Sequence, residues 1–199
     1  MGASYANIAV QGLSQQSISG FFAELNVAAV VGPEEGGWCV CSDAFSDMMD
    51  YEILTQFMKA LSKSGRLALG VSVYDEQQFR LWLASDGDVR STYDSCPGME
   101  LEDPSESDMK PVLTGSGAWP ELFPFVESEE KLLNVFRVGS DEEFVDPLEL
   151  HGEIVSFLRL PRYCLDFGYR YVTASNYGFE GADEVLKNTK IINGRTSFI

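Results

Sequence analysis

The chain has 199 residues, of which 45% are hydrophobic, enough for a large core in one domain or in one domain with an appended subdomain. Its 31 acidic residues far exceed its 14 basic ones, so the net charge is −17 and the isoelectric point is near 4.3. This charge argues against nucleic acid or an anionic membrane as a direct partner and favours a basic protein.

The cysteines and the apolar runs indicate the compartment. The four cysteines are Cys39, Cys41, Cys96 and Cys164, and their spacing matches neither a zinc motif nor a CxxC redox pair. No apolar run reaches the roughly 18 residues of a membrane span, and the first residues lack the basic and apolar regions of a secretory signal. We therefore expect a cytoplasmic protein with reduced thiols, no cofactor and no metal.

The first half of the chain predicts helices interleaved with strands. The expected elements, in order, are a strand over 5–11, a helix over 15–25 capped by Ser14, strands over 27–31 and 38–41, a helix over 50–64 and three strands within 66–98. In the last three strands, apolar residues alternate, and Asp86-Gly87-Asp88 is a hairpin signal because Gly tolerates positive φ.

The second half begins with an acidic stretch over 99–117 that is rich in Pro, Ser and Gly, which predicts a loop or linker. The elements expected after it are a helix from Ser128 through Val138, a helix from Pro147 to Leu160, a late strand over 163–173 and a short helix over 182–190.

This order of elements predicts an α+β fold: a mainly antiparallel sheet with helices packed on one face, plus a C-terminal helical subdomain. The expected boundaries are an α+β sheet domain over 1–98, an acidic loop or linker over 99–117, and a helical subdomain with a late strand over 118–199.

Negative charge is concentrated in one region of the chain. Residues 94–153 contain 16 acidic and three basic residues, a net charge of −13, whereas residues 154–199 have a net charge of +2. This acidic region is either a solvated surface that keeps the protein soluble or a face that docks a basic protein, since complementary charge accelerates association. The predicted partner-binding residues are Glu102, Asp103, Glu106, Asp108, Asp141, Glu142 and Glu143. Aromatic residues within the region are either anchors for a partner or core residues: Trp119, Phe123, Phe125 and Phe144.

Three smaller groups carry alternative chemistry. Cys96 and His151, with Asp94 to orient them, have the residue types of a thiol nucleophile and its base, although no catalytic signature surrounds them. Cys39 and Cys41 share one face of a predicted strand, which favours core packing over half a metal site. The acids of the pair Asp86/Asp88 and of the run 141–143 lack the spacing of a calcium loop and fit a turn and a helix start.

Several motifs resemble those of a family of uncharacterised bacterial proteins of about this length. They are the start MGASYANIAVQG, the segments Gly87-Asp88-Val89-Arg90 and Tyr93-Asp94-Ser95-Cys96-Pro97-Gly98, and the ending His151…Leu160-Pro161…Gly168-Tyr169-Arg170-Tyr171. The resemblance spans most of the chain and implies no reaction. Members of that family carry Gly-Gly-Asp after the acidic loop, where this chain has Thr114-Gly115-Ser116-Gly117.

The charge pattern and the lack of a catalytic signature together predict a protein-binding module and not an enzyme. The specific hypothesis is an immunity protein that neutralises a basic toxin, such as a nuclease, by masking its active site with carboxylates that mimic phosphate. The alternative is an enzyme or small-ligand-binding protein that uses Cys96 and His151. A third interpretation is an adaptor whose partner is not a toxin.

Overall fold

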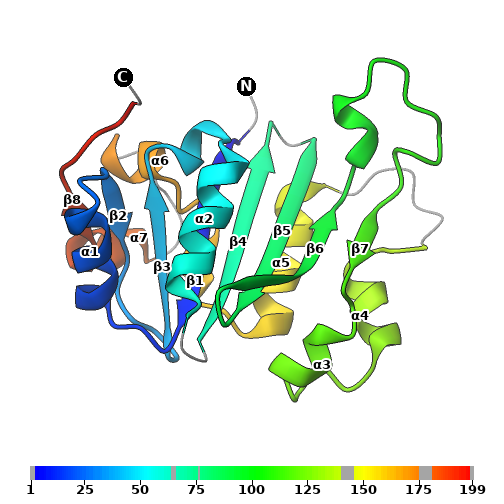
Figure 1. Ribbon diagram of the computed structural model, residues 1–199, viewed down its shortest axis with the longest axis horizontal. Helices are drawn as coiled ribbons and strands as arrows, with labels where there is room; N and C mark the ends of the chain where they lie inside the picture. The colour runs from blue at the N-terminus through cyan, green and yellow to red at the C-terminus, as the bar shows by residue number, and fades with distance from the viewer. Residues whose placement is uncertain (1–2, 64–65, 76, 140–145, 175–180, 198–199) are drawn as a thin grey trace.

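The computed structural model describes residues 3–63, 66–75, 77–139, 146–174 and 181–197. These residues form an eight-stranded sheet in which every neighbouring pair of strands is antiparallel (Figure 1). The α+β class and the antiparallel sheet expected from the sequence are therefore confirmed.

Seven of the eight described strands lie before α3, with α1 and α2 among them, and β8 follows the last helix. The strands are β1 (Tyr5–Gln11), β2 (Ala29–Val31), β3 (Trp38–Asp43), β4 (Leu67–Tyr74), β5 (Gln78–Ser85), β6 (Asp88–Asp94), β7 (Val112–Thr114) and β8 (Lys190–Ile192). The α-helices are α1 (Gln15–Glu24), α2 (Tyr51–Leu61), α3 (Ala118–Leu122), α4 (Glu129–Val135), α5 (Pro147–Leu158), α6 (Tyr169–Thr173) and α7 (Ala182–Asn188). Short 3-10 helices are η1 (Ser46–Met48), η2 (Pro97–Glu100) and η3 (Arg162–Cys164). None of the described helices is both long and apolar enough to cross a membrane.

The first six elements form a β-α-β-β-α-β unit. Within the sheet order β7-β6-β5-β4-β1-β3-β2-β8, the four strands of this unit lie as β4-β1-β3-β2, which is the ferredoxin-like arrangement. Local capping starts both of its helices: the Ser14 side chain accepts a hydrogen bond from the Ser17 N–H, and Asp50 accepts one from Ile53. The unit places α1 and α2 on the same face of the sheet.

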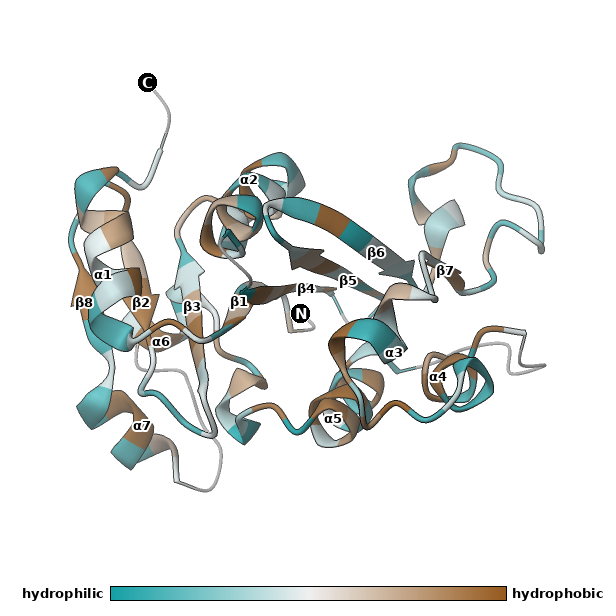
Figure 2. Cartoon of the chain, turned by 60° about the horizontal axis from the view of Figure 1, so that its bottom comes forward, coloured by the Kyte–Doolittle hydropathy of each residue, from teal (hydrophilic) through white to brown (hydrophobic). Residues whose placement is uncertain are grey.

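Helices cover both faces of the sheet, not one face as the sequence predicted (Figures 1 and 2). On β1, Ile8 and Val10 pack with Phe22 of α1 and Met58 of α2, whereas the alternate residue Ala9 belongs to the opposite apolar layer. The reason is that β1 and β4 are buried along almost their whole length, so both of their faces need an apolar cover.

The second layer joins the sheet to the C-terminal half of the chain. It contains the alternating apolar residues of β4 and β5 together with buried residues of α3, α4 and α5: Leu69, Val71, Val73, Phe79, Leu81, Leu83, Trp119, Leu132, Leu150 and Ile154. The described part of the C-terminal half thus packs on the sheet and shares its core. The expected domain boundaries at residues 98 and 117 stay predictions.

The late strand predicted over 163–173 is wrong: this stretch forms η3 and α6. We call residues 163–171 the C-terminal anchor, because its polar groups bond to distant parts of the chain. The Tyr163 hydroxyl donates to the Pro33 carbonyl and accepts from the Val40 N–H, and the Tyr169 N–H donates to Ser42 Oγ at 2.9 Å. The strand that does pair late in the chain is β8, on the outer side of β2.

The structure also defines the hairpin between β5 and β6 and a short strand within the stretch 99–117. Asp86 and Gly87 connect β5 to β6 with positive φ angles of 55° and 88°. The hairpin predicted at Asp86-Gly87-Asp88 is therefore confirmed, and its connection has two residues. The stretch predicted as a loop over 99–117 contains the short edge strand β7, which pairs with β6.

Candidate protein-binding surface

The acidic loop, residues 99–110, connects η2 to the residues before β7. It contains Glu100, Glu102, Asp103, Glu106 and Asp108 against one basic residue, so its net charge is −4. In Figure 1 the loop projects from the sheet beyond the end at which β4 finishes. All four of the residues predicted to bind a partner in this stretch are therefore at the surface, with Asp108 the least exposed of them.

The base of the loop is held by Asp94, the last residue of β6. Its Oδ1 accepts hydrogen bonds of 2.9 Å from the Cys96 N–H and from Gln78 Nε2, and its Oδ2 pairs with Arg80 Nε at 2.8 Å. Arg80 also reaches into the loop, where its Nη1 lies 2.9 Å from Glu100 Oε1. This network ties the start of the acidic loop to β5 and β6.

Within the loop, Asp108 closes a turn. Its Oδ2 accepts hydrogen bonds from the Ser105 N–H at 2.9 Å and from Ser105 Oγ at 2.5 Å, and these bonds lower the pKa of its carboxyl. Its backbone carbonyl accepts from the Gly98 N–H at 2.7 Å. A Cβ atom at Gly98 would lie 2.9 Å from that carbonyl, so only glycine permits this close approach. The loop therefore has a defined shape that its own carboxylate maintains.

The other three acids of the predicted set face solvent. Glu102, Asp103 and Glu106 are exposed, and none of them pairs with a basic side chain in the described chain. Within the described ranges, these three carboxylates thus have no salt bridge that neutralises their charge. The second predicted group, Asp141, Glu142 and Glu143, lies outside the described residues.

Most of the candidate aromatic anchors belong to the core. Trp119 is fully buried, its Nε1 donates to Ser91 Oγ at 2.8 Å, and its ring packs on Phe136 with centroids 5.3 Å apart. Phe123 is 3% exposed, while Phe125 is half-buried against the same apolar layer. Phe144 lies outside the described residues.

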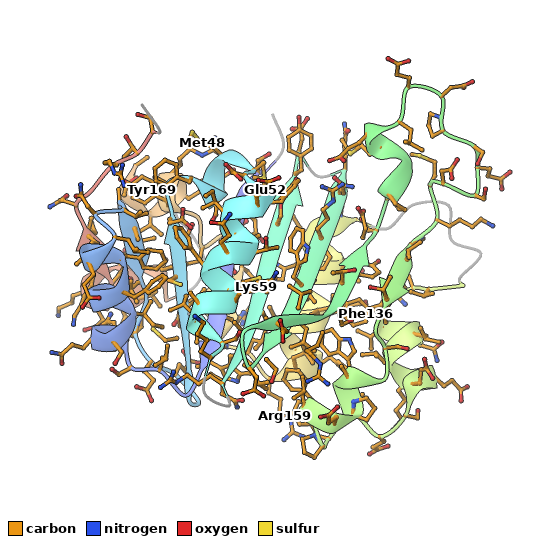
Figure 3. All side chains as sticks on the ribbon, viewed as in Figure 1. Met48, Glu52, Lys59, Phe136, Arg159 and Tyr169 are labelled. Carbon is orange, nitrogen blue, oxygen red and sulfur yellow. The ribbon has the colours of Figure 1, made fainter. Side chains whose placement is uncertain are left out.

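A hollow of about 390 Å³ lies at the base of the acidic loop, and sequence reasoning missed it. Its lining comes from η2, α2, β4, β5 and the residue after η1: Met49, Tyr51, Tyr74, Gln78, Met99 and Glu100. Large apolar side chains are exposed around it, among them Tyr74 at 42% and Leu101 at 52%. Figure 3 labels Met48 and Glu52, which lie beside the start of α2 at this same end of the sheet. The sequence indicated this hollow only through Met99, an apolar residue that lies shortly before the predicted acidic residues in the chain.

The structure gives no shared site to Cys96 and His151. His151 is fully buried, its Nδ1 lies 2.6 Å from the Tyr5 hydroxyl, and burial lowers its pKa to about 3. The Cys96 thiol contacts Met109 Sδ at 3.9 Å, and burial together with Asp94 raises its pKa. The imidazole is therefore neutral and the thiol is protonated at pH 7. Cys96 and His151 form no hydrogen bond with each other within the described part of the chain.

Cys39 and Cys41 have a structural role. Cys39 and Cys41 lie in the apolar layer under α1 and α2, where their thiols face the carbonyls of Gly32 and Ile8. Burial raises the pKa of Cys39 to about 12. The residues in the described ranges include no group of three or more His, Cys, Asp or Glu side chains that could hold a metal ion.

Two of the motifs that carry the family resemblance lie at structural junctions. Tyr93-Asp94-Ser95-Cys96-Pro97-Gly98 forms the base of the acidic loop, while Gly168-Tyr169-Arg170-Tyr171 lies in the C-terminal anchor. In the anchor, the Arg170 N–H and Nε both donate to Asp47 Oδ2 at 2.9 Å. Comparison with known proteins adds no relative: no family model, curated protein or solved structure matches the chain.

Proposed function

We propose that the chain is an acidic, cytoplasmic protein-binding module, and specifically an immunity protein that neutralises a basic toxin by masking its active site. The observation that carries this proposal is the projecting acidic loop, in which Glu102, Asp103 and Glu106 face solvent without a basic partner in the described chain. A basic surface on another protein is the natural counterpart of such a loop.

Shape supports the proposal as much as charge does. The bonds from Ser105 to Asp108 and from Gly98 to the Asp108 carbonyl hold the loop in one conformation before any partner arrives. Preorganisation reduces the conformational entropy that is lost on binding, so more of the interaction energy appears as affinity.

The mechanism follows from these two properties. A net charge of −17 attracts a basic partner over a distance of about 8–10 Å at physiological salt, and can accelerate association well above the neutral rate. On contact, the loop carboxylates occupy positions that substrate phosphates take in a nuclease groove, and the body of the protein blocks access to that groove.

The test is affinity capture of the tagged chain from the lysate of its native cell at low and at high salt. We expect one basic protein, retained at low salt and weakened at high salt. The triple variant Glu102→Gln/Asp103→Asn/Glu106→Gln should lose it. A matched variant, Glu24→Gln/Asp183→Asn/Glu184→Gln, removes the same charge from exposed positions on α1 and α7, at the opposite edge of the sheet, and should retain it.

The toxin hypothesis needs a second readout. The captured partner, once purified, should have an activity, such as nuclease activity, that the wild-type chain inhibits and the loop variant does not. Capture that is equal for both triple variants would contradict the loop as the binding surface. Capture of a partner without any activity that the chain inhibits would favour the adaptor interpretation.

A further inference from the structure

The hollow at the base of the acidic loop has a chemical character of its own. Two tyrosine rings, two methionine thioethers, one amide and one carboxylate line it, from Met49, Tyr51, Tyr74, Gln78, Met99 and Glu100. Its volume of about 390 Å³ lies near the lower end of the range for ligand sites. It is therefore suited to a side chain of a partner protein more than to a large cofactor.

The charge around the hollow favours a cation. Asp50 and Glu52 flank Tyr51 in the chain, Glu100 is part of the lining, and the acidic loop continues from it. Arg80 contacts the lining at Tyr51 and Glu100, and its charge is balanced by Asp94 and Glu100. An incoming positive charge thus meets a net negative surface.

The chain itself shows how this surface holds a guanidinium group. The Arg80 guanidinium carbon lies 4.7 Å from the centroid of the Tyr51 ring while its nitrogens pair with Asp94 and Glu100. An aromatic face combined with a carboxylate is the pairing that suits arginine, because its planar group stacks and forms two directed hydrogen bonds at once.

The lining of the hollow also contains a second aromatic side chain, Tyr74, together with the Glu100 carboxylate. The Tyr74 side chain is 42% exposed, and the Glu100 side chain stays 63% exposed although one of its oxygens pairs with Arg80. Met49 and Met99 supply adaptable apolar contacts for the aliphatic part of a long side chain.

We infer that this hollow is the anchor point for an arginine side chain of the partner protein, stacked on Tyr74 and paired with Glu100. The inference rests on the proposed function, because the acidic loop beside the hollow would bring the basic partner into place. The loop would supply long-range attraction, and the hollow would select arginine and fix the orientation of the complex.

The experiment is an NMR titration of the full chain, labelled with ¹³C at the methionine methyl groups, in low-salt buffer. The probes are three capped tripeptides, Ala-Arg-Ala, Ala-Lys-Ala and Ala-citrulline-Ala. We expect the arginine peptide to shift the Met49 and Met99 signals in a saturable way. The buried Met58 in α2 is the internal control and should not respond. The citrulline peptide, which has the same shape without charge, should shift neither signal.

Two variants test the stacking on Tyr74. Tyr74→Ala should weaken binding of the arginine peptide about two- to fivefold, the effect of losing one exposed cation–π contact. Tyr74→Phe keeps the ring and should bind as the wild type does. Equal binding of the lysine peptide would overturn the assignment to arginine, and equal affinity of Tyr74→Ala and wild type would overturn the stacked site.

The outcome also separates this inference from the proposed function. A shift confined to Met109, the methionine near the end of the acidic loop, would overturn the arginine site, while charge-dependent capture by the loop would still hold. Conversely, shifts at Met49 and Met99 with no partner captured from the lysate would support a guanidinium site and contradict the masking function.

Discussion

In the C-terminal anchor, charged and polar side chains bond within the molecule, whereas three of the five carboxylates in the acidic loop face solvent and form no salt bridge within the described chain. Asp47 is fully buried and is the residue to which Arg170 of the anchor bonds. It accepts hydrogen bonds from the Arg170 N–H and Nε and, at 3.3 Å, from the Ala6 N–H. Asp103 in the loop has no such partner in the described chain. The same residue type therefore serves folding in one region and is available for binding in the other.

The difference has a simple physical basis. A buried carboxylate without hydrogen bonds costs several kcal/mol, so Asp47 can occur in the interior only with its partners in place. An exposed carboxylate is solvated by water in the folded and in the unfolded chain, so it hardly changes the free energy of folding. Substitutions should accordingly change stability in the anchor and binding in the loop.

Asp47→Ala should have the largest effect on stability. It leaves the Ala6 and Arg170 N–H groups without an acceptor, and we expect a loss of about 2–3 kcal/mol in the free energy of unfolding. Urea denaturation followed by circular dichroism measures it. The control is Asp183→Ala, an exposed acid in the first turn of α7, which should cost no more than about 0.5 kcal/mol. A loss below that level for Asp47→Ala would contradict the structural role of the anchor.

Gly168→Ala should cost about 1–3 kcal/mol by crowding. The added Cβ would lie 2.6 Å from Asp47 Oδ1 and 2.7 Å from Tyr5 Cβ. The matched variant is Gly152→Ala in α5, where the new Cβ meets nothing within 4 Å. That change should stabilise the protein by up to about 1 kcal/mol, because alanine favours helix over glycine. Thermal unfolding of both variants compares them directly, and equal melting temperatures would refute the close contact at Gly168.

His151 should make stability fall as the pH is lowered. In the unfolded chain it binds a proton below its ordinary pKa of 6.5, whereas in the folded protein its pKa is about 3. Acid therefore favours the unfolded chain across this window, by about 1.5 kcal/mol between pH 6.5 and 5. Chemical denaturation at several pH values should show this slope in the wild type and a smaller one in His151→Gln. Parallel pH profiles for the two proteins would contradict it.

Asp94→Asn, at the base of the acidic loop, should affect the loop more than the rest of the sheet. It removes the charge that pairs with Arg80 and weakens the hydrogen bonds at the base of the loop, so we expect about 1 kcal/mol of global destabilisation. Hydrogen exchange at the Cys96 and Gly98 amides should accelerate more than exchange in β4. An equal change at all sites would mean that Asp94 does not organise the loop.

The smallest effect on stability should come from the triple variant Glu102→Gln/Asp103→Asn/Glu106→Gln. Its free energy of unfolding should stay within about 0.5 kcal/mol of the wild type, because these side chains make no buried contact. Partner capture should nevertheless fall. A large loss of stability would show that these carboxylates belong to the fold and would remove the contrast between the two regions.

Elements that depend on local patterns were predicted well from the sequence. The alternation in β4 and β5, the 3.6-residue period of α2 and the cap Ser14 all operate over a few residues, and the structure confirms them. Asp50, predicted as the first residue of the second helix, is its N-cap. The two faces of the sheet were not distinguished, although the uniformly apolar stretches of β1 and β4 indicate burial on both sides.

For the surface, the sequence identified the acidic loop as a charged stretch but not its geometry. The loop and the hollow come together because β5, β6 and α2 bring Arg80, Asp94 and Tyr51 side by side from distant positions. No local sequence pattern predicts that residues so far apart in the chain come together. The role of Asp108 in closing the loop turn likewise becomes visible only in three dimensions.

By itself, then, the sequence determined the α+β class, most elements of the sheet unit and the concentration of negative charge, since each depends on composition or on short-range periodicity. The tertiary structure alone decided the conformation of residues 163–173, whose alternating aromatic residues are typical of a strand. There, Ser42 and Asp47 accept hydrogen bonds from the first N–H groups of α6. A helix start needs such acceptors, and here they come from more than 120 residues away in the chain.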